Sequence, residues 1–158
     1  MIRFAQATKP PLPKNQRAVG VALLYVGVLV VFALAQLFSF EEFLLLVRDF
    51  ALPGGQPVAY FLAAFIVTVE IFALPYLLRM QLSFAMRLLS MVMGWLVALL
   101  WLGIALWLTL TGSTVTNIGF FGDVIAYSPG WLSVAVSLVL GTMAVIVSRG
   151  MWAIARRK

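Results

Sequence analysis

The chain has no cysteine and no histidine among its 158 residues. Disulfides, thiolate nucleophiles and imidazole acid–base chemistry are therefore excluded for its side chains. Zinc, copper and haem centres rely mainly on sulfur and imidazole ligands, so the sequence predicts no metal site of these kinds. Charge is also scarce, because charged residues make up 10% of the chain, against about 25% in soluble domains. This composition argues against a soluble domain.

Four long apolar segments fill most of the chain, which is 64% hydrophobic with a mean hydropathy of +1.09. They cover residues 18–38, 57–78, 84–110 and 131–154. Each approaches or exceeds the roughly 20 residues that a helix needs to cross a hydrocarbon core of about 30 Å. A backbone in lipid must satisfy its own hydrogen bonds, so each segment is predicted to be an α-helix. The expected fold is all-α, a single integral membrane four-helix bundle over residues 18–154.

Basic residues gather in the three segments that share one side of the membrane after four crossings. These segments are the tail 1–17, the turn between the second and third helices, and the tail 155–158. The positive-inside rule then predicts that both termini are cytoplasmic, and we expect a bacterial inner (plasma) membrane protein. Because the basic residues are split among short flanks, the lipid bilayer is their expected partner and nucleic acid is not.

Two segments on the opposite side are predicted to be folded. Residues 40–50 are too short to span and are predicted to form an amphipathic interfacial helix, with Ser39 and Glu42 as a capping box. Residues 112–130 form the longest connection, and their glycine–aromatic pattern predicts a folded cap loop, since a disordered linker would hold fewer aromatics. The single carboxylate of this loop supplies too few oxygen ligands to bind a metal ion, so it is expected to stabilise a turn. The residues singled out in the cap loop are Gly119, Phe120, Phe121, Gly122 and Asp123.

Three segments carry a family resemblance: residues 37–43, residues 69–78 around Glu70, and residues 117–123. In their order and spacing the chain resembles the DoxX/MauE-like group of small four-helix membrane proteins, over about residues 18–150. MauE-type members carry Cys-Gly-Cys-Phe-Gly in the third segment, where this chain has Ile118-Gly119-Phe120-Phe121-Gly122. The resemblance implies a link to quinone-dependent oxidation or to the assembly of periplasmic redox enzymes. Because Ile118 and Phe120 replace the two cysteines, dithiol exchange by this loop is excluded.

Glu70 is the first candidate for chemistry, because it lies well inside the second predicted helix. An ionised group there costs about 2.5–3.5 kcal/mol or more before compensation. Arg87 is predicted to be its partner: counted across the hairpin, Glu70 lies about five residues deeper, or ~7.5 Å at 1.5 Å per residue. The pair is interpreted either as a structural contact that fixes helix packing or as a proton-accepting, ligand-anchoring site.

The candidate ligand-binding residues are Pro75, Trp95 and Trp101. Pro75 is expected to kink the second helix and to free a carbonyl near Glu70. Trp95 and Trp101 lie deep in the third helix, where they either pack against other helices or flank a flat ligand such as a quinone or a lipid. Gln36 and the buried hydroxyls are expected to act as packing contacts.

Three functions remain open from the sequence. A noncatalytic accessory or assembly subunit, which binds and positions a partner membrane protein, is favoured because no complete catalytic constellation is present. A quinone-linked oxidoreductase subunit would use Glu70 to handle a proton and would need a redox partner. A small transporter would also use Glu70, although the chain has no inverted repeat.

Overall fold

The computed structural model describes residues 6–152 and contains five helices in that range, four of them long and apolar enough to cross a membrane. This confirms the predicted all-α, four-helix membrane bundle. The four long helices are α1 (Gln16–Phe38), α3 (Gly55–Leu77), α4 (Phe84–Leu110) and α5 (Trp131–Met151). α5 stops at Met151 because Trp152 is extended. The last two residues of the predicted fourth helix and the tail 155–158 lie outside the described residues.

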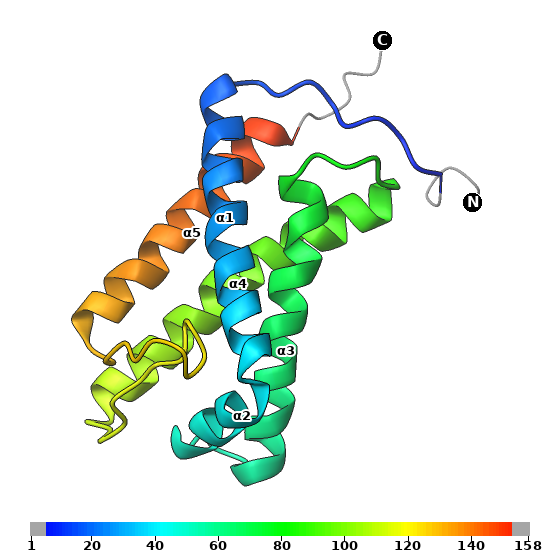
Figure 1. Cartoon of the computed structure of the whole chain (residues 1–158). Helices are drawn as coiled ribbons and strands as arrows, with labels where there is room; N and C mark the ends of the chain where they lie inside the picture. The colour runs from blue at the N-terminus through cyan, green and yellow to red at the C-terminus, as the bar shows by residue number, and fades with distance from the viewer. Residues whose placement is uncertain (1–5, 153–158) are drawn as a thin grey trace.

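The four long helices form a ring in which α1 and α4 each pack against both α3 and α5. Neighbours in the ring run antiparallel, so α1 begins and α5 ends at the same end of the bundle (Figure 1). We call this the terminal end; the turn between α3 and α4 also lies there. The opposite end, called the cap end, carries the short helix α2 (Phe40–Asp49) and the cap loop of residues 112–130.

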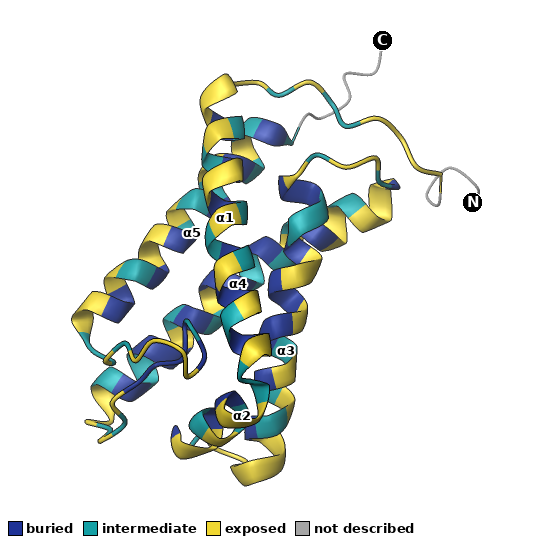
Figure 2. Ribbon diagram, in the orientation of Figure 1, coloured by how far each residue is buried: buried dark blue, intermediate teal, exposed yellow. Residues whose placement is uncertain are grey.

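Buried residues follow the inward sides of the long helices, and exposed residues follow their outward sides (Figure 2). Small residues allow the backbones to approach closely at several crossings. A methyl group added to Gly150 of α5 would overlap Ala18 of α1, and one added to Gly94 of α4 would lie 3.9 Å from Ala73 of α3. Lipid is as apolar as the helices, so such close packing is a main source of bundle stability.

The starts of α1 and α4 are set by side chains that accept backbone N–H groups. Asn15 Oδ1 accepts from the Arg17 N–H at 2.9 Å, so α1 begins two residues before its apolar run. Ser83 accepts from the Met86 N–H and starts α4 at the predicted residue. Before α1, the chain crosses the terminal end, where Thr8 pairs with Leu82 of the α3–α4 turn.

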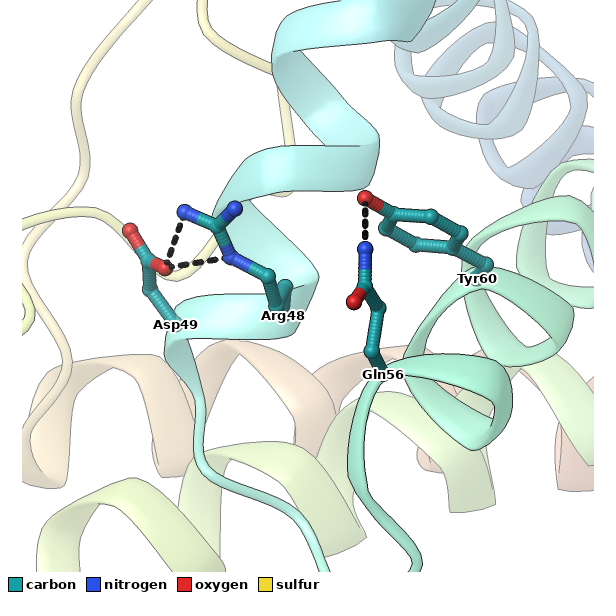
Figure 3. Close-up of polar contacts among 4 residues, drawn as sticks. All are labelled: Arg48, Asp49, Gln56 and Tyr60. Atoms are coloured by element: carbon teal, nitrogen blue, oxygen red, sulfur yellow. Dashed lines mark hydrogen bonds and ion pairs between the residues drawn. The ribbon is translucent and has the colours of Figure 1, made fainter.

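α2 is amphipathic as expected, because Phe43 and Val47 are buried and both glutamates in its first turn are exposed. The predicted capping box is wrong. Ser39 makes no capping hydrogen bond to α2; its hydroxyl donates to Ala35 O of α1 and accepts from the Asp123 N–H of the cap loop. Exposed polar contacts follow at this end, Arg48 with Asp49 at 3.0 Å and Gln56 with Tyr60 at 2.7 Å (Figure 3).

The cap loop is folded onto the bundle. Asn117 organises it, since its Nδ2 donates to Gly122 O and its Oδ1 accepts from the Gly119 and Tyr127 N–H groups. Gly119 and Gly122 both have positive φ, and a side chain on Gly122 would crowd the backbone of α1 at about 3.0 Å. Glycine is therefore required where the loop touches α1.

Candidate functional site

Glu70 lies inside the bundle and is 0% exposed. Its Oε1 accepts from Trp101 Nε1 of α4 at 2.9 Å and from Gln36 Nε2 of α1 at 3.4 Å. Both donor residues are also 0% exposed. One carboxyl oxygen thus joins three of the four long helices through side chains that water does not reach.

Gln36 links this carboxyl to the cap loop. Its Nε2 also donates to the Phe120 carbonyl at 3.1 Å, so the amide bridges α3 and the loop. The Phe120 ring is buried and lies 4.7 Å from the Trp101 ring, centroid to centroid. Phe32 of α1 stacks on the Phe120 ring at 5.3 Å and also meets the Trp101 ring edge-on at 6.3 Å. The cap loop therefore closes the polar cluster with aromatic rings.

Two oxygen atoms of this cluster have no hydrogen-bond partner among the residues that the structure describes. They are Glu70 Oε2 and Gln36 Oε1, and both are buried. Leaving a buried acceptor unpaired costs about 1–3 kcal/mol in proteins, so most are satisfied. Two unpaired acceptors on hydrogen-bonded neighbours therefore mark this cluster as the leading candidate site.

The predicted Glu70–Arg87 pair is wrong. Gly94 faces Ala73, so residue 97 of α4 is roughly level with Glu70, and Arg87 lies about ten residues, or about 15 Å, nearer the terminal end. Its guanidinium instead donates to the Thr8 hydroxyl at 3.0 Å. Among residues 6–152 the single ion pair joins Arg48 and Asp49, so Glu70 has no cation within ion-pair distance there.

Pro75 lies within α3, and the backbone groups beside it are bonded to another helix. Ser90 Oγ of α4 accepts from the Tyr76 N–H at 2.9 Å and donates to Ala73 O at 3.2 Å. A neighbouring serine commonly satisfies backbone groups released by proline in a membrane helix. The proline therefore contributes to a structural contact between α3 and α4 that the Ser90 hydroxyl makes.

Trp95 and Trp101 do not flank one site. Six residues apart, they point about 120° apart around α4. Trp101 packs against Phe32 and Phe120 in the core. Trp95 is half-buried and borders a separate cavity of about 10 Å³ beside Tyr25 and Tyr76. Of the two, only Trp101 contacts Glu70.

A larger hollow lies on the outward surface of α1. Its volume is about 560 Å³, and its lining is apolar. Gly27 sits within it, and no atom lies within 4 Å of a methyl group built on that glycine. The lining includes Leu23, Leu24, Gly27, Val31, Phe32 and Phe121.

Scans against protein-family models, curated proteins and solved structures find no match to the chain. Its function must be inferred from its own geometry. That geometry consists of a closed polar cluster in the core and an open apolar hollow on the surface.

Proposed function

We propose that the chain is a noncatalytic integral membrane accessory or assembly subunit that binds and positions a partner membrane protein. The observation that supports this proposal is the complete burial of the Glu70 cluster. Glu70, Gln36 and Trp101 are fully buried, and their hydrogen bonds join α1, α3, α4 and the cap loop. An arrangement of this kind holds a bundle in one shape, which leaves the outer surfaces to meet a partner.

The partner is proposed to place a transmembrane helix in the hollow on α1. Gly20 and Gly27 are both exposed and lie about two turns apart, which places them on nearly the same side of the helix. Added methyl groups at both would meet no atom within 4 Å. Small residues at this spacing let a second helix approach closely in lipid, where packing drives association.

A purification from native membranes in mild detergent tests this proposal, with co-eluting proteins identified by mass spectrometry. We expect a stoichiometric membrane protein with the wild type and with Gly103→Leu, which alters an exposed glycine on α4. Gly27→Leu should lose it, because the larger side chain fills the hollow. A partner that survives Gly27→Leu would refute the docking face, and a chain that elutes without any partner would refute the subunit role.

The proposed location is a bacterial inner membrane with both termini in the cytoplasm. Basic residues of the described range, such as Lys14, Arg79 and Arg87, support it because they lie at the terminal end, while Asp123 lies at the cap end. The chain has no native cysteine. On intact cells a membrane-impermeant maleimide should label Asp123→Cys, and Gln81→Cys should be labelled only after lysis. The reverse labelling pattern would refute this orientation.

The DoxX/MauE-like assignment is also a proposal. It is supported by the short helix after α1, the buried glutamate of α3 and the folded loop between α4 and α5. Ile118 and Phe120, which stand where the related motif has cysteines, are both buried. Here we propose that packing of the two apolar side chains takes over the anchoring of the loop.

A quinone-linked subunit is the second candidate, supported by the unpaired Glu70 Oε2 beside the Trp101 and Phe120 rings. A quinol hydroxyl could donate to that oxygen if the aromatic cover opened. The same purification decides this: quinone that co-elutes with the wild type and is lost in Glu70→Gln would favour it over the accessory role. For a transporter, the corresponding result is flux into liposomes that the same substitution abolishes.

A further inference from the structure

The two unpaired acceptors of the buried cluster belong to side chains that already share one hydrogen bond. Gln36 Nε2 donates to Glu70 Oε1, while Gln36 Oε1 and Glu70 Oε2 are left over. A primary amide and a carboxylic acid can pair through two hydrogen bonds, with the amide N–H donating to one acid oxygen and the acid O–H donating to the amide oxygen. One half of that pair is present here, and both oxygens of the other half are buried without a donor in the described part of the chain.

We propose that Glu70 and Gln36 form a buried proton-binding site. Glu70 Oε2 takes a proton from water, and the new O–H bond donates to Gln36 Oε1. A single proton thereby gives both unpaired atoms a partner and removes the charge from the carboxyl. The ionised form would leave both acceptors unpaired inside the membrane, where an isolated charge is costly.

Within residues 6–152, no nearby charge offers the ionised form an alternative. On α1 the titratable neighbour is Tyr25, whose hydroxyl donates to Gly94 O at 2.7 Å. Tyr127 of the cap loop packs against Phe120. The remaining charged or titratable side chains on the packed elements lie toward the two ends: Arg17, Tyr76, Arg79, Arg87 and Arg149 at the terminal end, and Glu41, Glu42, Arg48, Asp49, Tyr60 and Asp123 at the cap end.

The site connects proton binding to the cap loop. The Gln36 amide that would accept the acid proton also donates to the Phe120 carbonyl. Loss of the proton removes one of the bonds that fix this amide. The loop contact and the proton therefore share one side chain, and the proposed site is independent of which partner the bundle binds.

Infrared spectroscopy of the protein in lipid vesicles tests the proposal directly. The chain has three glutamates, Glu41, Glu42 and Glu70, and the first two are exposed. A Glu41→Gln/Glu42→Gln chain, labelled isotopically at its glutamate carboxyl carbons, reports on Glu70 alone without altering the cluster. We expect an isotope-shifted carbonyl band of a protonated acid at neutral pH. Carboxylate bands alone would overturn the proposal and indicate an ionised Glu70, for example one bridged to Gln36 by a buried water.

A second substitution tests whether Gln36 is the hydrogen-bond partner of the protonated Glu70. In the same labelled chain, Gln36→Met should move the acid band to higher frequency, because Glu70 Oε1 loses a donor. Gln56→Met is the matched control, since that exposed glutamine bonds Tyr60 and lies about 21 Å from Glu70 along α3, at 1.5 Å per residue. An acid band that Gln36→Met leaves in place would overturn the assignment of Gln36. If Gln36→Met does not fold, the first measurement, in which Gln36 is unchanged, still shows whether Glu70 is protonated.

Discussion

Replacement of Ser90 by alanine should destabilise the bundle much more than the loss of a typical helix hydroxyl. Ser90 Oγ is buried, accepts from the Tyr76 N–H at 2.9 Å and donates to Ala73 O at 3.2 Å. An N–H group left without an acceptor costs about 1–3 kcal/mol. The Ala73 carbonyl loses a longer hydrogen bond, and such a bond between membrane helices typically contributes about 0.5 kcal/mol. We expect Ser90→Ala to lower the unfolding free energy by about 2 kcal/mol.

We expect Pro75 to be the reason that the Tyr76 N–H is bonded to another helix. Pro75 has no N–H, and its ring crowds the carbonyl of the preceding turn, which disturbs the hydrogen-bond ladder beside Tyr76. In a Pro75→Ala background a regular α3 would give the Tyr76 N–H its own carbonyl. The cost of Ser90→Ala should then fall to about 0.5 kcal/mol, leaving a coupling energy of about 1.5 kcal/mol.

The assay is unfolding of the purified protein in mixed micelles by a denaturing detergent, followed by tryptophan fluorescence and circular dichroism. Ser137→Ala is the matched control. Ser137 is equally buried, but its hydroxyl donates to Ser133 O of its own helix, so its loss strands no group. We expect that control to stay within about 0.5 kcal/mol of the wild type. Equal costs for Ser90→Ala and Ser137→Ala, or the same Ser90→Ala cost with and without Pro75, would refute the reasoning.

Two further predictions concern the cluster and the α1–α5 crossing. Gln36→Leu should lower the unfolding free energy by about 1–2 kcal/mol, because the Phe120 carbonyl loses its donor. The same substitution should speed proteolysis of the cap loop. Unchanged proteolysis would contradict the link between the Gln36 amide and the loop. Gly150→Ala should cost about 1–3 kcal/mol, because the new methyl group overlaps Ala18 and the two helices must separate. Gly103→Ala meets no atom within 4 Å and should be neutral or slightly stabilising in the same unfolding assay, so equal effects would contradict the packing argument.

Helix positions were the most predictable feature, because length and hydropathy determine them directly. The predicted third span, 84–110, coincides with α4, whose start is fixed by the Ser83 cap. Local rules failed where a distant segment competed for the same group. Ser39 and Glu42 have the spacing of a capping box, but the Ser39 hydroxyl is taken by Ala35 O and by the cap loop. A contact 84 residues away in sequence has no local signal.

The sequence predicts the central residue of the candidate site, Glu70, but it does not predict which residues donate hydrogen bonds to it. Burial of Glu70 follows from its place in an apolar helix, but its donors depend on how α1 and α4 rotate against α3. Counting residues across the α3–α4 turn fixes the order of the two helices and leaves the depth of each side chain open. Arg87 therefore looked close, although it lies at the terminal end. Gln36 carries a usable signal, as a lone amide near the end of an apolar helix, although the sequence predicts only a packing contact for it.

Side-chain hydrogen bonds stabilise some helix contacts of this bundle, and close packing stabilises the others. Side-chain hydrogen bonds join α1, α3 and α4, through Tyr25, Ser90 and the Glu70 cluster. The hydroxyls of Ser137 and Thr142 in α5 bond within their own helix. α5 instead approaches its neighbours at glycines, against Ala18 of α1 and Ala98 of α4. In lipid such contacts depend on fit rather than on water exclusion. A methyl group added to Gly150 should therefore weaken the contact between α5 and α1, whereas the α1–α3–α4 unit keeps its hydrogen bonds.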